Sequence, residues 1–384
     1  MNYVITKYTK YITLLFFVLS CLSFAFTLRS AYYSCFDFKT LTDVSRCLLN
    51  GYDIYDSNVI NKFKILPTYE PSCYLFLMPF LFVSWEKAKL LWIGLNIVLT
   101  VLLVKDITEL YLEKKHFPYL LGLVILSQPW RTHMHVGQCV IWSLYFFVLS
   151  IKLEKKGMTV RSGLALTLSL FKFHLIIPML LFFVLYKRKW KNVLIASAFQ
   201  FIILLIISAY VKASPVQLLL GPLKYTKTLT GKIETGYLDV FAFWGRLIDS
   251  STSLSILSGL IIITVLIHVL LNKNIKDELG ILTITSMISS ILMYHRSYDY
   301  LVIVFSFSWI LNSRNNINVN LVAFSIGVYL VGFCSFHYFE YIPSLQYIAE
   351  LMQGTYFLTI LSISWYLSIF ALISQMKKGN VKCE

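Results

Sequence analysis

The chain has 384 residues, of which 58% are hydrophobic and 14% charged, and its mean hydropathy is +0.70. Soluble domains contain roughly 45–50% apolar residues, so this composition excludes an ordinary soluble protein and predicts a polytopic membrane protein. The net charge of +15 does not indicate a nucleic-acid partner. The basic residues form short groups between apolar runs, and no nucleic-acid-binding motif is present.

Apolar runs that cross, or nearly cross, a bilayer core needing about 20 helical residues recur along the whole chain. They lie at 11–28, 73–84, 88–104, 117–128, 138–151, 162–186, 193–211, 253–271, 279–293, 300–311, 319–335 and 355–373. We expect about 10–12 transmembrane or half-membrane helices in a single domain, 1–384. The fold class is all-α, because backbone in lipid must satisfy its own hydrogen bonds. The first run resembles a signal peptide but lacks a small-x-small cleavage site, so an uncleaved helix is expected.

The basic residues predict the orientation, because short cytoplasmic loops carry an excess of Lys and Arg. With the N-terminus in the cytoplasm, the groups at 105–115, 152–161, 187–191, 273–276, 314 and 377–382 all fall on the same side. The segments 29–70 and 212–250 then become external loops, and 374–384 becomes a cytoplasmic tail. We expect a multi-pass protein of the plasma membrane with both termini inside the cell.

This layout requires two irregular segments. Glu70 is predicted outside and Lys105 inside, so the chain must cross the membrane an odd number of times between them, although two apolar runs, 73–84 and 88–104, lie there. We therefore expect 73–84 to be a short helix that is inserted at, or lies along, the outer interface. The run 162–186 has basic residues at both ends, so it should enter and return as two half-helices with Phe171–His174 at the turn. Broken helices around intramembrane polar residues usually line a cavity.

The polar segment 36–70 follows the first apolar run and places a carboxylate, Asp37, a few residues past a membrane exit. A group in this position can meet both a lipid-borne substrate and water. The alternative is that Asp37 caps the helix predicted after it, since Asp is a favourable N-cap residue. Its position alone does not decide between these two interpretations.

Five polar elements fall on the same predicted face of the membrane, which indicates an active site there. They are the Asp37 loop, the turn Gln128–Gln138, the break with Lys172 and His174, the loop 212–250 and the motif Tyr294–Asp299. Ordinary alternatives remain open for each: Lys172 could snorkel to the interface, and Arg131 or Arg296 could be a counter-ion for Asp299 or Glu70.

Metal and disulfide chemistry have weak support in the sequence. His133 and His135 would lie on different helix faces, so no zinc site is expected. The seven cysteines show no CxxC spacing, and Cys35 with Cys47 is the one pair placed to bridge.

The order of these motifs resembles the GT-C membrane glycosyltransferases, and among them glycosyltransferase family 87, the polyprenyl-phosphate-mannose-dependent mannosyltransferases. The similarity rests on an external Asp37, a turn from Gly51 to Tyr55, a Pro-bearing second helix at Pro71 and Pro79, Pro129 followed by Gly137-Gln138, Lys172 in mid-helix, the basic group Lys187–Lys191 and the late motif His295–Asp299. Two motifs depart from the family pattern: Tyr69-Glu70-Pro71-Ser72 replaces Tyr-x-Pro-Pro, and Tyr294–Asp299 replaces Ser-Pro-x-Ser-Trp.

The resemblance implies transfer of mannose or another hexose or pentose from a polyprenyl-phosphate donor to a hydroxyl of a lipid or glycan acceptor, with inversion, on the external or periplasmic face. Asp37 would be the base. The donor phosphate and substrate would be bound by Lys172, His295, Arg296, Arg131, Gln138, Asp299 and Tyr55. No cofactor or metal is required, because the leaving group is a phosphomonoester and no Asp-x-Asp triplet occurs. A transporter, or a flippase or polymerase of lipid-linked glycans, is the alternative.

Overall fold

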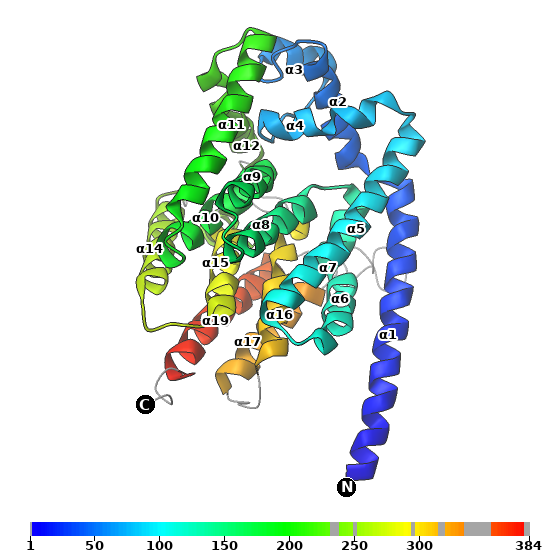
Figure 1. Cartoon of the computed structure of the whole chain (residues 1–384), viewed down its shortest axis with the longest axis vertical. Helices are drawn as coiled ribbons and strands as arrows, with labels where there is room; N and C mark the ends of the chain where they lie inside the picture. Colours follow the sequence, from blue (N-terminus) through cyan, green and yellow to red (C-terminus); the bar gives the residue numbers. More distant parts are fainter. Residues whose placement is uncertain are drawn as a thin grey trace.

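The computed structural model describes residues 2–230, 238–248, 252–292, 296–313, 319–333 and 355–379 (Figure 1). Every secondary-structure element in these ranges is a helix, which confirms the predicted all-α class. The residues 380–384, His295, Cys334 and Cys383 lie outside the described residues. Helix α1 (Asn2–Tyr33) runs along one side of the bundle, where it packs against α6 and α7, and its N-terminal part extends beyond the other helices.

The segment after α1 folds into three short helices, α2 (Phe36–Leu49), α3 (Ser57–Phe63) and α4 (Pro71–Leu77). Helix α2 is amphipathic and buries a face that includes Phe38, Leu41, Val44 and Leu48. The turn predicted at 51–55 is present: Gly51 adopts φ +77°, and the Tyr55 N–H donates to Asp53 Oδ1 at 2.9 Å. The predicted short helix at 73–84 is observed as Pro71–Phe82, which is too short for a full span.

The next helices are α5 (Trp85–Tyr111), α6 (Phe117–Leu126), α7 (Gln128–Val136) and α8 (Val140–Lys155). We expected a turn at 128–138, but most of this segment is helix α7. Pro129 does not prevent this, because the first helical turn tolerates proline. The turn is confined to Gly137–Cys139, where the chain bends by 117° between α7 and α8.

The structure places the histidines and cysteines that the sequence analysis discussed. His133 contacts Asn96 Oδ1 of α5 at 3.0 Å and His135 contacts Ser30 of α1 at 2.6 Å, so the two imidazoles face different helices as expected. Cys35 and Cys47 are both free thiols. The cysteines that lie close together are Cys73 and Cys139, whose sulfur atoms are 4.0 Å apart.

Helices α9 (Thr159–Ser169) and α10 (Phe173–Leu181) form the predicted pair of half-helices. As one straight helix, the 28 residues of Thr159–Tyr186 would be about 42 Å long. However, the residues just past its C-terminal end return to its start, because the Asn192 amide donates to Ser162 Oγ at 2.6 Å. Lys189 is likewise 2.9 Å from Glu154, at the end of α8. The chain therefore reverses direction at the short turn Leu170–Lys172.

The remaining described helices complete the bundle. They are α11 (Trp190–Val211), α12 (Pro215–Thr230), α13 (Val240–Leu247), α14 (Thr252–Leu271), α15 (Glu278–Leu292), α16 (Ile303–Asn312), α17 (Val319–Phe333) and α19 (Thr355–Gly379). The predicted loop 212–250 thus contains two helices, and α19 continues into the predicted tail. By length and composition alone, six described segments could cross a membrane, or seven with the bent α7–α8 pair, and three shorter apolar helices accompany them. One of the six is Thr159–Tyr186, which folds back at Leu170–Lys172.

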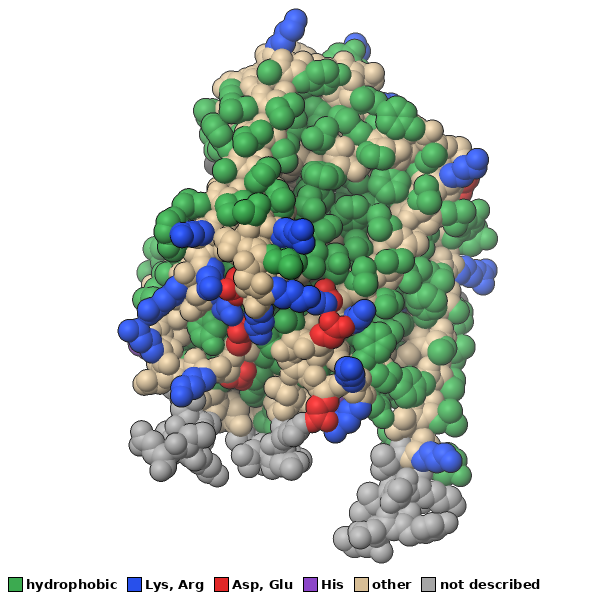
Figure 2. Space-filling model, viewed as in Figure 1, with side chains coloured by type: hydrophobic (Ala, Val, Ile, Leu, Met, Phe, Trp, Pro, Cys, Tyr) green, Lys and Arg blue, Asp and Glu red, His purple; other side chains and the backbone are tan. Residues whose placement is uncertain are grey.

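Of the basic groups predicted on one side of the membrane, members of those at 105–115, 152–161 and 187–191 lie together at one end of the bundle. Arg314 and the side chains at 377–382 lie outside the described residues. Lys152 contacts Asp106 and Glu109 at the end of α5, at 2.5 and 2.7 Å. Lys155 and Lys187 both contact Glu278, at 3.0 and 3.1 Å. We call this set, together with Glu154 and Lys189, the basic end. Figure 2 shows its charged side chains gathered in the lower half of one face, below a largely apolar surface.

Candidate active site

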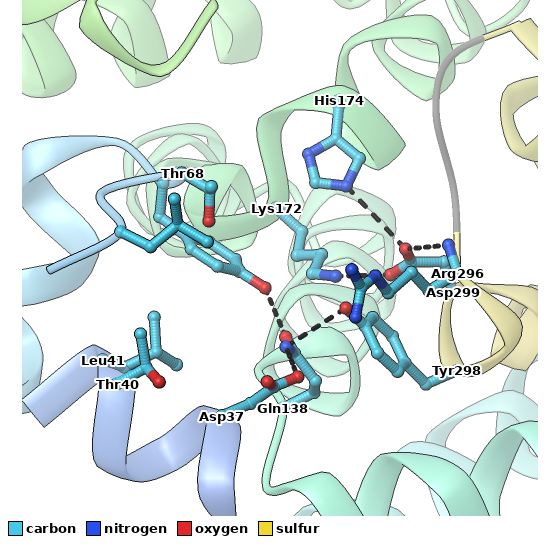
Figure 3. A pocket seen from close by; sticks show the side chains of 12 residues that line it. Asp37, Thr40, Leu41, Thr68, Gln138, Lys172, His174, Arg296, Tyr298 and Asp299 are labelled. Carbon is cyan, nitrogen blue, oxygen red and sulfur yellow. Dashed lines mark hydrogen bonds and ion pairs between the residues drawn. The ribbon is translucent and has the colours of Figure 1, made fainter. Parts of the chain in front are cut away.

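A cavity of about 110 Å³ lies at the opposite end of α8 and α9 from the basic end (Figure 3). Its walls come from α2, the segment before α4, the α7–α8 turn, the α9–α10 break and the 3-10 helix η5 (Ser297–Val302). The lining residues are Asp37, Thr40, Leu41, Leu66, Thr68, Tyr69, Gln138, Lys172, His174, Arg296, Tyr298 and Asp299. Segments far apart in the sequence thus bring carboxylates and cations around one space.

The Gly137-Gln138 pair fits closely against the start of α2. Gly137 has φ +78°, and a Cβ there would lie 2.8 Å from the Cβ of Phe38, so no larger residue fits without a shift. The Cys35 N–H donates to the His135 carbonyl at 2.8 Å and fixes the same contact from the other side. Glycine therefore allows the approach that places Gln138 beside Asp37.

The alternative interpretation, in which Asp37 caps α2, is wrong. Cys35 occupies the N-cap position, and Asp37 lies in the first turn. Its carboxylate accepts a hydrogen bond from the Gln138 side-chain amide (Figure 3). Burial raises the pKa of Asp37 above its ordinary value, while the Gln138 hydrogen bond and the charges of Arg296 and Lys172 lower it. Asp37 is therefore an aspartate whose proton affinity is raised by desolvation and limited by its neighbours.

Lys172 is buried, with 1% of its side chain exposed, and does not snorkel to an interface. Its ammonium group is 2.5 Å from Asp299 Oδ1 and lies over the rings of Tyr298 and Tyr69, 4.4 and 5.4 Å from their centroids. The Lys172 backbone N–H, left over at the helix break, donates to Ser143 Oγ at 3.0 Å. The break is thus stabilised on both the backbone and the side chain.

Asp299 links η5 to the α9–α10 break. Besides Lys172 at 2.5 Å, it accepts the Arg296 backbone N–H at 3.0 Å, and His174 Nε2 lies 4.0 Å from the same Asp299 oxygen, Oδ2. Its closest cation is thus Lys172 rather than Arg296 or Arg131, which the sequence suggested as possible counter-ions. Arg296 still lines the cavity on the same side.

The other predicted residues lie elsewhere. Tyr55 is buried outside the cavity, and its hydroxyl donates to the backbone carbonyl of Tyr69. Arg131 lies on α7 and is not among the lining residues. His295 falls in a segment outside the described residues. Of the predicted set, the structure brings together Asp37, Gln138, Lys172, Arg296 and Asp299.

Seven of the twelve lining residues were not among the site residues chosen from the sequence, and three of these, Tyr69, His174 and Tyr298, carry aromatic polar groups. Each has a signal nearby: His174 follows the lysine at the helix break, and Tyr298 lies inside the late polar motif. Tyr69 was noted as a departure from a family motif and not as a functional group. Local composition gave no reason to select these aromatic residues from the chain's many tyrosines.

A second, larger cavity of about 330 Å³ is lined by residues next in sequence to those of the first, at the start of α4 and of α10. Tyr69 lines the polar cavity and the next residue, Glu70, lines the larger one, together with side chains of α10, α11 and α12. Its walls are mostly apolar and include Phe173, Leu180 and Leu204. An apolar space beside a charged site suits a ligand with a polar head and a hydrocarbon chain.

The all-helical fold, the apolar spans and the buried polar cavity define a membrane-embedded protein with a candidate catalytic centre. Residues 68–294 match the family model of glycosyltransferase family 87. This match covers more than half of the chain, which therefore belongs to glycosyltransferase family 87 and is a membrane glycosyltransferase. Gln138 and Lys172 lie within the match, whereas Asp37 precedes it. Comparisons with curated proteins and with solved structures gave no match.

Proposed function

We propose that this glycosyltransferase transfers a hexose or pentose, such as mannose, from a polyprenyl-phosphate donor to a hydroxyl of a lipid or glycan acceptor. The main supporting observation is that a carboxylate, Asp37, and the cations Lys172 and Arg296 line the same cavity. Sugar transfer needs both: a base for the acceptor proton and positive charge for the departing phosphate.

Asp37 acts as the base. The acceptor oxygen attacks the anomeric carbon and forms the new C–O bond, while the bond from this carbon to the phosphate oxygen breaks. The hydroxyl proton passes to the Asp37 carboxylate, and the electron pair of the broken bond leaves on polyprenyl phosphate. A single displacement of this kind inverts the anomeric centre. The raised pKa of Asp37 suits proton transfer, because a base works best when its pKa is near the working pH.

Lys172 and Arg296 stabilise the phosphate. A lysine ammonium carries three N–H donors, and Asp299 accepts one of them. A guanidinium group, such as that of Arg296, can contact two phosphate oxygens at once. Because the leaving group is a phosphomonoester and not a nucleoside diphosphate, we propose that no metal takes part. Turnover should then persist in excess EDTA.

The larger apolar cavity holds the first isoprene units of the donor. Its wall residue Glu70 follows Tyr69 of the polar cavity in the sequence, and its wall helix α11 is an apolar span whose surface is largely exposed. We place the site on the external face of the plasma membrane, because the basic end lies away from the cavity and basic loops are normally cytoplasmic. Both termini are then cytoplasmic.

The test is turnover by an Asp37→Asn variant. Purified full-length protein is incubated with a panel of polyprenyl-phosphate sugars and candidate acceptors, and release of free polyprenyl phosphate is measured. Asn keeps the size of Asp but cannot take a proton, so the rate should fall about 10²–10⁴-fold, the usual contribution of a general base. Asp43→Asn, on the same helix but outside the cavity, is the matched control. Normal turnover by a folded Asp37→Asn protein would exclude Asp37 as the base.

A further inference from the structure

Gln138 is the residue that contacts Asp37 directly, and the orientation of its side-chain amide decides what kind of contact this is. A glutamine amide has one acceptor atom and one donor atom that exchange places when the group turns by half a revolution. With Nε2 toward Asp37 the contact is a hydrogen bond to the carboxylate. With Oε1 toward Asp37 it would place two acceptor oxygens against each other.

The described structure has the first of these orientations, and the Tyr69 hydroxyl, which can donate as well as accept, is the donor to Oε1. The Tyr69 hydroxyl donates to Gln138 Oε1, so Nε2 points the other way, toward Asp37 and toward the Tyr298 hydroxyl at 3.3 Å. Both Nε2 hydrogens then have acceptors. Gln138 and Tyr69 are 4% and 5% exposed, so water has little access to replace the missing donor if the Tyr69 hydroxyl is removed.

Tyr69 is itself held in place on both sides of its backbone. Its N–H donates to the Tyr74 hydroxyl at 3.0 Å, and its carbonyl accepts from the Tyr55 hydroxyl. Tyr55 was expected from the sequence to bind substrate. In the structure its hydroxyl donates to the backbone of Tyr69, the residue that contacts Gln138. The helical loop after α1 thus connects to the site through consecutive hydrogen bonds from Tyr55 to Tyr69, Gln138 and Asp37.

We propose that Tyr69 is a positioning residue, which fixes the amide orientation of Gln138 and so directs its N–H group to Asp37. The inference rests on the proposed function, in which Asp37 is the base. In this arrangement Gln138 donates a hydrogen bond to Asp37 and does not bind the donor phosphate. A carboxylate that accepts an N–H hydrogen bond is stabilised in its ionised form, and the ionised form is the one that can receive the acceptor proton.

Other ionisable groups also surround Asp37 and contribute to its titration. They are Tyr69 before α4, Lys172 and His174 at the α9–α10 break, and Arg296, Tyr298 and Asp299 at η5. The substitution Tyr69→Phe leaves all of these except Tyr69 itself and keeps the aromatic face beside Lys172. It therefore removes the hydroxyl that orients the amide with little change in the surrounding charge.

The experiment is an infrared pH titration of the Asp37 carboxyl band in the full-length protein, without substrate. The band is isolated by subtracting the spectrum of the matching Asp37→Asn protein. Tyr69→Phe should raise the midpoint by about 1–2 pH units, which corresponds to the usual strength of a hydrogen bond to a charged group. Gln138→Leu should raise it similarly, and Tyr69→Phe should add nothing in the Gln138→Leu background.

The control variant is Tyr111→Phe, which removes a tyrosine hydroxyl that donates to Glu278 at 2.7 Å at the basic end, away from the cavity. Its midpoint should match the wild type. An unchanged midpoint in Tyr69→Phe, or an equal shift in Tyr111→Phe, would overturn the proposal. The titration needs no donor or acceptor, so its result is independent of the turnover assay that tests the proposed function.

Discussion

The two ends of the helical bundle use the same residue types in opposite ways. At the basic end, the lysines still reach water although their acidic partners are buried: Lys189 is 51% and Lys152 22% exposed, against 7% for Glu154 and 6% for Asp106. At the cavity, the pair Lys172–Asp299 is 1% and 3% exposed. Exposed pairs form at little cost, whereas a buried pair must offset the desolvation of both charges. The costly pair is the one at the candidate active site, as expected for charges retained for function.

Breaking the buried pair should have the largest effect. Lys172→Met leaves the Asp299 charge buried without its closest cation, which typically costs about 3–5 kcal/mol, and removes a proposed phosphate ligand. We expect a clear fall in the thermal unfolding temperature in detergent and a loss of donor turnover. The double variant Lys172→Met/Asp299→Asn should regain much of the stability without regaining turnover. A Lys172→Met protein with wild-type stability and turnover would remove the distinction between the two ends.

The close approach at Gly137 can be compared with a glycine at the basic end. Gly137 and Gly157 have φ +78° and +73°, but a Cβ would meet Phe38 at 2.8 Å in the first and nothing within 4 Å in the second. Both alanine variants pay the left-handed backbone cost of about 1–2 kcal/mol. Gly137→Ala should lose more than this and also lower turnover, whereas Gly157→Ala should keep its turnover. Equal losses in unfolding and turnover assays would contradict the tight packing at the site.

Glu70 provides a pH-dependent comparison. Burial raises its pKa from the ordinary value of 4.5 to about 7, so the folded protein holds this proton more tightly than the unfolded chain. Its contribution to stability is therefore complete below pH about 4.5 and is lost as the pH rises through about 7. Between pH 5 and pH 8 the unfolding temperature should fall less in Glu70→Gln than in the wild type.

The exposed Glu86→Gln is the control for this measurement, since the Glu86 side chain is 59% exposed. It should follow the wild-type pH dependence. Parallel curves for Glu70→Gln and the wild type would show that Glu70 ionises with an ordinary pKa.

The smallest effect is expected for Lys189, an exposed lysine at the basic end. Lys189→Met makes the same substitution as Lys172→Met, but Glu154 keeps Lys187 at 3.5 Å. The free energy of unfolding should change by about 0.2–1 kcal/mol, with the difference reduced in high salt. Turnover should equal that of the wild type. A loss as large as that of Lys172→Met would mean that the basic end also bears on catalysis.

The sequence by itself determined the features that depend on local composition. Apolar runs predicted an all-helical membrane protein, and basic groups predicted which helix ends lie together. Lys172 inside an apolar run with charge at both ends predicted a fold-back at Phe171–His174, and the structure has it at Leu170–Lys172. These predictions succeeded because the cost of placing charge or unpaired backbone in hydrocarbon is set by the segment itself.

Tertiary structure decided the partners. Lys172 pairs with Asp299, 127 residues further along the chain, and Gln138 contacts Asp37 across 101 residues. No periodicity in the sequence encodes these distances, because they arise where α2, the α7–α8 turn and η5 pack together. The same packing turns Tyr55 toward the backbone of Tyr69 and leaves Arg131 outside the cavity, although motif order had grouped both with the site. Side-chain direction depends on the final position of each helix, which only the packed bundle fixes.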